Sequence, residues 1–353
     1  MVMNEKSLNI PFKLLSWENS IYNLRRIQKR LFKTVYVADF KKALKIQKLI
    51  LKSNFARLLA IREVTQVSPT RKVSGIDGKT SLSFTERFEL NEYIKFNVIH
   101  WEFNRLKKVS LASKSGKIIK FLIPTISDRV WQTLIGFAIE PAHEVNFHPR
   151  SYGFRNSCTV HNLQKLIFLN LSKESFGFQK RVLSLEISLS FGIYDYKILL
   201  RKIIAPRGIK LGIFRSLISG VKPSFDFNSE FNDSFDIGSI YANILLNGIE
   251  KVHACVRFGY FCLFFLKPYD NENNIVTKVS TFFEASGVNI SLNNISLSFG
   301  SQGFNFLDWF FKIDDFGNCY STPSFTNYQI FLKRVKYIIN NSNYGAVRHC
   351  EYL

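Results

Sequence analysis

The chain has 353 residues, of which 46% are hydrophobic, so it is long enough for more than one core and too apolar to be disordered. Its 48 Lys and Arg against 27 Asp and Glu give a net charge of +21, concentrated in residues 1–120, which hold 25 basic and 9 acidic side chains. Five cysteines without a CxxC pair and six histidines without ligand spacing exclude the common zinc and disulfide patterns, and we expect no metal and no cofactor.

The N-terminal region is predicted to form helices with one basic face. From Ser16 to about Val37 apolar residues recur at helical spacing, with Ser16 placed to cap, and Asp39 can cap a second helix whose apolar residues continue to Leu59. Residues 21–60 contain eleven basic side chains and one acidic side chain. Because a solvated helix face normally mixes the two signs, we expect these cations to contact RNA phosphates. They are Arg25, Arg26, Lys29, Arg30, Lys33, Lys41, Lys42, Lys45, Lys48, Lys52 and Arg57.

The next basic feature is a predicted hairpin over residues 106–124. Two short apolar strands flank a turn at Ser115 and Gly116. Three lysines lie in and beside this turn, and we expect them to contact an RNA backbone: Lys114, Lys117 and Lys120.

A Pro-led turn then leads into a predicted helix that starts near Asp128. Its apolar residues recur at helical spacing, and we expect it to end at Glu140 because Pro141 disfavours an unbroken helix. A compact aromatic segment, SYGFR, follows at residues 151–155.

The rest of the chain mixes helices and strands, which predicts an α+β fold. In chain order we expect a helix at 160–171, a strand and then a helix in 182–203, a helix within 233–252, a strand hairpin at 254–267, an alternating strand at 288–299, a turn and strand after Gly300, and a helix after Pro323. The longest apolar run, 258–266, is nine residues, far below the roughly 20 that a membrane-spanning helix needs, so we expect no membrane association.

The order PT..DR..Q......EP..E..F...SYGFR in residues 124–155 resembles the fingers and palm of group II intron reverse transcriptases. The segments LLAIREVTQ (58–66) and SGIDG (74–78) resemble the N-terminal extension of the same family. This resemblance implies a reverse-transcriptase-like fold with four parts: a basic, RNA-binding helical extension (1–78), fingers and the start of the palm (79–181), a degenerate palm (182–320) and the start of a truncated thumb (321–353). It also suggests that Arg129 and Arg155 hold the fold or touch RNA.

In that family three palm aspartates hold the two metal ions of phosphoryl transfer. The first belongs to a motif matched here by Glu186-Ile187, whose accompanying aspartate is replaced by Gly192. The other two belong to a motif like RYADDF, and Tyr260 and Phe261 stand in their places. Since neither ring can ligate magnesium in that role, we expect no catalytic residues, no bound metal and no polymerase activity.

The resemblance implies a maturase-like protein that is not an enzyme, binds intron RNA and helps it to fold and splice. The expected partners are the intron RNA and another maturase or a host splicing protein, with no small-molecule substrate. Two alternatives stay open: a scaffold that binds no RNA or a decaying reading frame, and a residual RNA-directed DNA polymerase. A residue usage typical of A/T-rich codons, with no evident import signal, predicts synthesis inside an organelle, a chloroplast rather than a mitochondrion.

Overall fold

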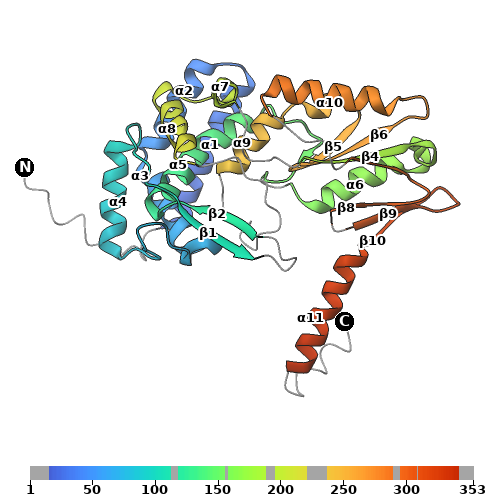
Figure 1. The fold of residues 1–353 in the computed structure, drawn as a ribbon. Coiled ribbons are helices and arrows are strands. Elements are labelled where there is room, and N and C mark those ends of the chain that lie inside the picture. The colour runs from blue at the N-terminus through green and yellow to red at the C-terminus, as the bar shows by residue number, and fades with distance from the viewer. Residues whose placement is uncertain are drawn as a thin grey trace, which may run out of the picture. The chain divides into compact units, whose positions relative to one another are not determined.

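The computed structural model describes residues 16–112, 118–155, 158–187, 195–220, 237–288, 295–307 and 309–341. The chain forms two compact units, each built from separate stretches of sequence. Unit 1 comprises Met1–His148, Leu189–Gly248 and Phe283–Asn289, and unit 2 comprises Pro149–Ser188, Ile249–Phe282 and Ile290–Leu353. Helices and strands occur together, which confirms the predicted α+β class (Figure 1). The four-part division drawn from the sequence stays a prediction.

Unit 1 is mainly helical. Its elements are α1 (Trp17–Tyr36), α2 (Phe40–Lys52), α3 (Asn54–Arg62), a π-helical turn (Glu63–Val67), a 3₁₀ turn (Pro69–Lys72), α4 (Phe84–Asn97), the antiparallel hairpin β1 (Lys107–Ala112) and β2 (Ile118–Ile123), α5 (Ile126–Glu144), α7 (Tyr196–Lys202), α8 (Arg207–Ile218) and α9 (Ile237–Leu246). The predicted hairpin is confirmed, and its turn lies outside the described residues.

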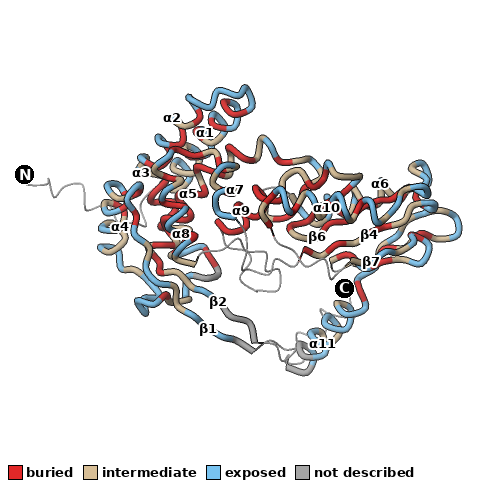
Figure 2. Tube along the Cα trace, turned by 45° about the horizontal axis from the view of Figure 1, so that its top comes forward, coloured by how far each residue is buried: buried red, intermediate tan, exposed pale blue. Residues whose placement is uncertain are grey.

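Helix α5 forms the centre of unit 1, where it packs against α1, α2, α3 and α9. Thr125 caps its start by accepting a hydrogen bond from the Asp128 backbone N–H at 3.3 Å. Most of its residues are buried, among them Trp131 and Leu134 with no exposed surface (Figure 2). A helix that is apolar on nearly every side needs neighbours all round, and these four helices supply them.

The predicted end of this helix at Glu140 is wrong, because α5 continues through Pro141 to Glu144. A proline lacks the N–H that would bond the carbonyl four residues earlier, here that of Phe137. The side-chain Nε2 of Gln28 in α1 donates to that carbonyl at 3.0 Å. Gln47 in α2 donates to the next carbonyl, Ala138 O, at 3.0 Å. Gln28 therefore satisfies the carbonyl that the proline cannot serve, and Gln47 adds a second side-chain bond at the next carbonyl.

The N-terminal helices agree with the sequence except at two points. Asp39 caps α2 as predicted, with its side chain accepting from the Lys42 N–H at 3.0 Å. Ser16 precedes α1 but makes no side-chain capping bond. The expected continuation to Leu59 is interrupted at Ser53, whose extended backbone separates α2 from α3.

Unit 2 is built on a five-stranded sheet in the order β3-β5-β6-β4-β7, in which β3 pairs parallel to β5 and the other pairs are antiparallel. A second sheet has the order β10-β9-β8. The elements are β3 (Ser151–Tyr152), α6 (Val160–Leu171), β4 (Arg181–Glu186), β5 (Cys255–Phe258), β6 (Phe261–Leu266), α10 (Glu272–Ser286, whose last four residues belong to unit 1), β7 (Ile295–Phe299), β8 (Phe304–Phe306), β9 (Trp309–Ile313), β10 (Cys319–Pro323) and α11 (Phe325–Asn341), with 3₁₀ turns at Lys173–Ser175, Gly177–Gln179 and Ile249–Lys251.

A buried ion pair fixes one end of the larger sheet. Arg257 in β5 donates through Nε to Glu250 Oε1 at 2.7 Å, and neither side chain has exposed surface. The same guanidinium donates to the Gly259 carbonyl at 2.8 Å and to the Ser151 hydroxyl. One cation therefore joins β3, β5 and the turn into β6.

The described elements confirm the predicted helix at 160–171, the strand and helix in 182–203, and the hairpin at 254–267. Within the described ranges, no helix is long and apolar enough to cross a membrane.

Candidate nucleic-acid interface

The outward face of α1 is basic. Leu24, Ile27 and Leu31 are buried on its inner side, at the three- and four-residue spacing of one helix face. The predicted cations of this helix are all exposed: Arg25, Arg26, Lys29, Arg30 and Lys33. The amphipathic pattern therefore does two things at once, because burying the apolar stripe leaves the charged side chains in solvent.

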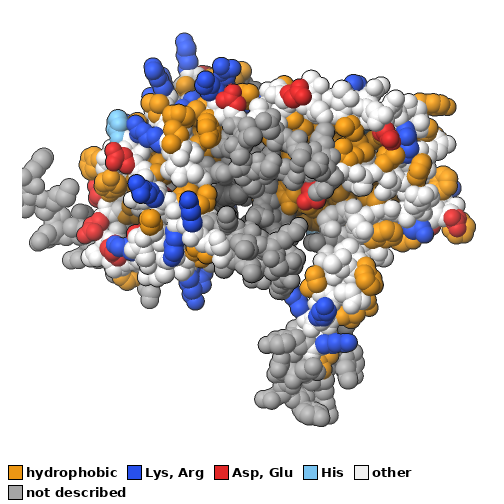
Figure 3. All heavy atoms as spheres, viewed as in Figure 1, with side chains coloured by type: hydrophobic (Ala, Val, Ile, Leu, Met, Phe, Trp, Pro, Cys, Tyr) orange, Lys and Arg blue, Asp and Glu red, His pale blue; other side chains and the backbone are white. Residues whose placement is uncertain are grey.

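Helix α2 repeats this arrangement, with Ala43, Ile46 and Ile50 buried. Its five predicted cations are exposed: Lys41, Lys42, Lys45, Lys48 and Lys52. Helices α1 and α2 pack against each other in unit 1, so the ten side chains belong to one compact pair of helices. Figure 3 shows Lys and Arg side chains projecting from the region of α2.

The ten cations have no carboxylate partner in the part of the chain that the structure describes. The ion pairs found there involve other residues. Like charges spaced three or four residues apart repel one another on an isolated helix. A polyanion bound to this face would relieve that repulsion, because its phosphates carry the opposite charge. The counterions released from those phosphates would also favour binding.

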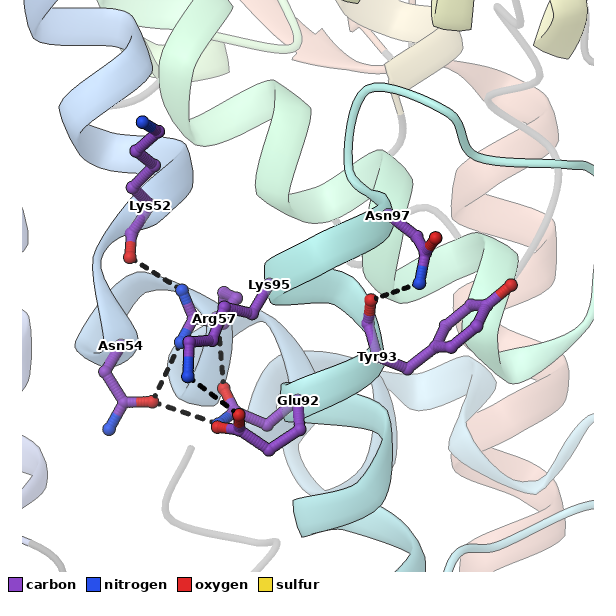
Figure 4. A network of polar contacts seen from close by, with 8 residues as sticks. Lys52, Asn54, Arg57, Glu92, Tyr93, Lys95 and Asn97 are labelled. Atoms are coloured by element: carbon purple, nitrogen blue, oxygen red, sulfur yellow. Dashed lines mark hydrogen bonds and ion pairs between the residues drawn. The ribbon is translucent and has the colours of Figure 1, made fainter. Parts of the chain in front are cut away.

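The eleventh predicted cation, Arg57, lies elsewhere, which corrects the sequence prediction. It is only 3% exposed and points into a network between α3 and α4 (Figure 4). Its Nε donates to Asn91 Oδ1 at 3.1 Å, its Nη1 to the Lys52 carbonyl at 2.6 Å and its Nη2 to Asn54 Oδ1 at 3.3 Å. Burial lowers the pKa of this guanidinium, against the opposing effect of the Glu92 charge. Arg57 therefore binds the last carbonyl of α2 inside the protein and is not part of the exposed basic face.

Arg129 and Arg155 also hold backbone. Arg129, at the start of α5, donates through Nη2 to the Val73 carbonyl at 2.7 Å, and burial lowers the pKa of its guanidinium. Arg155, in unit 2, donates through Nη1 to the Ser151 carbonyl. Of the two roles expected for these arginines, the contacts favour holding the fold.

The three hairpin lysines contribute no described side chain. Lys114 and Lys117 lie outside the described residues. Lys120 is paired with Ser110 in the β1–β2 ladder, and its side chain is not described. Their proposed contact with RNA therefore stays a prediction.

A second basic pair of helices, which the sequence analysis missed, adjoins α2. Gln47 in α2 donates to the Ile204 carbonyl, between α7 and α8, at 2.7 Å. Four cations on these two helices are exposed: Lys197, Arg201, Arg207 and Arg215. The signal was present in the composition, since residues 195–220 hold six basic side chains and one acidic side chain.

Two ionisable groups of α5 are perturbed beneath the basic helices. Burial, with a smaller contribution from the Glu144 charge, raises the pKa of Glu140 to about 7. Burial and the Lys210 charge lower the pKa of His143 to about 3, and its Nε2 accepts from the Ile204 N–H at 3.0 Å. His143 is buried in the packing of unit 1, and Glu140 is partly buried beside it.

In unit 2 the predicted palm positions come together. Glu186 at the end of β4 pairs directly with Phe261 at the start of β6, and the Ile187 N–H donates to the Tyr260 carbonyl at 3.0 Å. The Tyr260 and Phe261 ring centroids are 4.3 Å apart, and Phe261 also meets Phe306 edge-on. Gly192 lies outside the described residues.

These side chains do not fit a pair of magnesium ions. Magnesium prefers carboxylate and other oxygen ligands in near-octahedral geometry, and only Glu186 of the three offers a carboxylate. Within the described part of the chain, no group of three or more His, Cys, Asp or Glu is placed to hold a metal ion.

Comparison with known proteins adds an independent observation. The family described as the N-terminal domain of reverse transcriptase matches residues 12–94, a range that includes α1 to α3 and most of α4. The chain is 48% identical over 335 residues to a protein of Euglena longa named maturase-like protein 1, and 47% identical over 333 residues to one of the same name from Euglena gracilis. These alignments cover 94% of this chain and 73% and 72% of the relatives. Protein YkfC of Escherichia coli (strain K12) is 26% identical over 208 residues, 53% of this chain and 52% of that protein.

Proposed function

This chain belongs to the maturase-like protein 1 family, and we propose from that premise that it acts as a group II intron maturase-like, RNA-binding protein. It assists the folding and splicing of an intron RNA, while the cleavage and joining chemistry belongs to the RNA. The match to the N-terminal domain of reverse transcriptase supports the same ancestry.

The ten exposed cations of α1 and α2, which form no ion pair among the described residues, carry the proposal. Phosphate contacts of this kind supply affinity and position an RNA, but they read no sequence. Selectivity for one intron must therefore come from the shape of the RNA and from its unpaired loops.

We further propose that the protein has no polymerase activity. Glu186 is a single carboxylate paired across the sheet with Phe261, and Tyr260 lies beside it. A two-metal phosphoryl transfer needs several acids that converge on the metals, and these rings supply none. The packing between Tyr260, Phe261 and Phe306 supports a purely structural role for this hairpin.

The finer assignments follow from the same family. We propose that the chain has the fingers, palm and first thumb helix of a reverse transcriptase behind its basic N-terminal extension. We propose an organellar origin, in a plastid rather than a mitochondrion, in keeping with the relatives from Euglena. Another maturase or a host splicing protein is the proposed second partner in splicing.

RNA binding tests the proposal directly. A filter-binding assay with an intron RNA at about 50 and 200 mM salt should show affinity falling by roughly 10³ to 10⁵, as expected for six to ten phosphate contacts. Replacing Arg25, Arg26, Lys29 and Arg30 by Gln should weaken binding and flatten this salt dependence.

The matched control removes the same charge from unit 2. Four exposed lysines there, Lys165, Lys173, Lys251 and Lys278, are replaced by Gln, and this variant should retain most of the affinity. Absence of salt-dependent binding in the unmodified protein would overturn the proposal and favour a scaffold that binds no RNA. An equal loss in the two quadruple variants would remove α1 from the interface.

A further inference from the structure

Two tyrosines stand among the cations of α1. Tyr22 is 66% exposed and Tyr36 is 75% exposed, although both belong to a helix that packs into the core of unit 1. Within the described residues, neither ring stacks on another ring or on a cation. Most of each ring is therefore available to a ligand.

The two rings lie on one line with three of the predicted cations. Successive members of this line are four, three, four and three residues apart, so at 3.6 residues per turn all five fall within an arc of about 80°. Leu31, which has no exposed surface, lies on the opposite side of the helix. We call this line the α1 stripe: Tyr22, Arg26, Lys29, Lys33 and Tyr36. At 1.5 Å per residue, its two rings are about 21 Å apart along the helix axis.

Neither folding nor a membrane explains rings at these positions. A tyrosine that stays largely in solvent contributes little hydrophobic free energy to folding. Its helix propensity is also lower than that of the Arg and Lys residues beside it. Amphipathic helices that bind membranes insert their apolar face. The apolar face of α1, with Leu24 and Ile27, is already packed against its neighbours in unit 1. What remains is a ligand that uses flat rings and cations together.

Unpaired RNA has this chemistry. Its bases can turn out and stack on aromatic side chains while its phosphates contact cations, whereas the bases of a duplex are hidden in a deep, narrow groove and by their own stacking. We propose that the α1 stripe binds an unpaired segment of RNA, with Tyr22 and Tyr36 each stacking on a base and the three cations contacting the phosphates between them. This inference rests on the proposed RNA-binding function and specifies the class of RNA that α1 recognises.

The test compares two fluorescently labelled RNAs by anisotropy: an unstructured 12-nucleotide strand and a 12-base-pair duplex. The double variant Tyr22→Ala/Tyr36→Ala should bind the single strand at least about tenfold more weakly, because two stacking contacts are lost. Its affinity for the duplex should change less than about twofold, and its salt slope should stay the same because no phosphate contact is removed.

Two control variants separate ring stacking from other effects. Tyr22→Phe/Tyr36→Phe keeps both rings and should bind the single strand as the unmodified protein does. Tyr269→Ala removes a ring that is 99% exposed in unit 2 and should leave binding unchanged. Thermal melting should be the same for all these variants, since the rings replaced are exposed.

The outcomes distinguish this inference from the function on which it rests. If the unmodified protein binds both RNAs with steep salt dependence and the Ala variant binds equally well, base stacking is refuted while RNA binding stands. If the Ala variant loses the duplex as strongly as the single strand, selectivity for unpaired RNA is refuted. If the unmodified protein binds neither RNA at about 50 mM salt, both proposals fail.

Discussion

The side-chain amide of Gln28 donates a 3.0 Å hydrogen bond to the backbone carbonyl of Phe137, the acceptor that Pro141 cannot serve within α5. Gln28, which precedes Phe137 by 109 positions in the chain, thus supplies the hydrogen bond that Pro141 removes from α5. This contact joins the basic helix α1 to the central helix of unit 1. It holds the surface proposed to bind RNA at the point where α5 lacks one of its own backbone hydrogen bonds.

We predict that Gln28→Leu destabilises unit 1 by about 1–3 kcal/mol, because it leaves the Phe137 carbonyl without its donor. In a Pro141→Ala background the same change should cost clearly less, since an alanine at this position restores the backbone N–H. Chemical denaturation of the four proteins of this double-mutant cycle measures the coupling. Equal costs in both backgrounds would show that Gln28 does not compensate for the proline.

The raised pKa of Glu140 predicts a pH-dependent stability. Folding favours its protonated form, so this stabilisation is complete below the ordinary pKa of about 4.5 and is lost as the pH rises through about 7. Glu140→Gln cannot ionise, and its stability relative to the unmodified protein should increase by roughly 3 kcal/mol between pH 4.5 and pH 8. Urea denaturation at both pH values measures this difference.

His143 has the opposite sign, because its lowered pKa makes stability fall as the pH drops below about 6.5. It is present in both proteins and therefore cancels from the comparison. A difference between Glu140→Gln and the unmodified protein that stays constant from pH 4.5 to pH 8 would refute the assignment to Glu140.

The buried pair of Arg257 and Glu250 should be costly to break. Glu250→Leu leaves an uncompensated cation with no exposed surface, and we expect unit 2 to lose about 3–5 kcal/mol of stability. Adding Arg257→Met should recover much of that loss, because no buried charge then remains. As a control, Lys95→Gln removes the exposed pair with Glu92, which should matter by less than about 1 kcal/mol. A double variant as unstable as the single one would contradict this reading.

The interior position of Arg57 separates stability from RNA binding. Arg57→Gln should lower the melting temperature, because it removes bonds to Asn91 and to the Lys52 carbonyl. Its RNA affinity, measured below the melting transition, should keep the salt slope of the unmodified protein. Lys48→Gln should do the reverse, leaving the melting temperature nearly unchanged and reducing the slope by about 0.7–0.9. If both variants reduce the slope equally, Arg57 reaches RNA after all.

A primer-extension assay checks the palm. With magnesium or manganese, a primed RNA template and all four nucleotides, we expect no extension, because Glu186 supplies a single carboxylate beside Tyr260 and Phe261. An active reverse transcriptase in the same mixture verifies the conditions. Templated product from this protein would show that metal-dependent chemistry survives, and it would restore the polymerase alternative.

The sequence by itself determined the α+β class, the two N-terminal helices and the exposed face on which ten of the eleven predicted cations lie. These depend on helical periodicity and on local composition, which neighbouring residues settle among themselves. It also indicated the reverse-transcriptase ancestry through residues 124–155 and the aromatic replacements Tyr260 and Phe261.

Only the tertiary structure decided the outcomes that depend on distant partners. Arg57 has the same local charge pattern as its neighbours, yet the packing of α3 against α4 turns it inward toward Asn91. Pro141 reads locally as a helix end, yet Gln28 from another helix supplies the missing donor. In each case the free energy that stabilises the observed arrangement comes from a contact between segments far apart in the chain. The local spacing of residues does not encode such a contact.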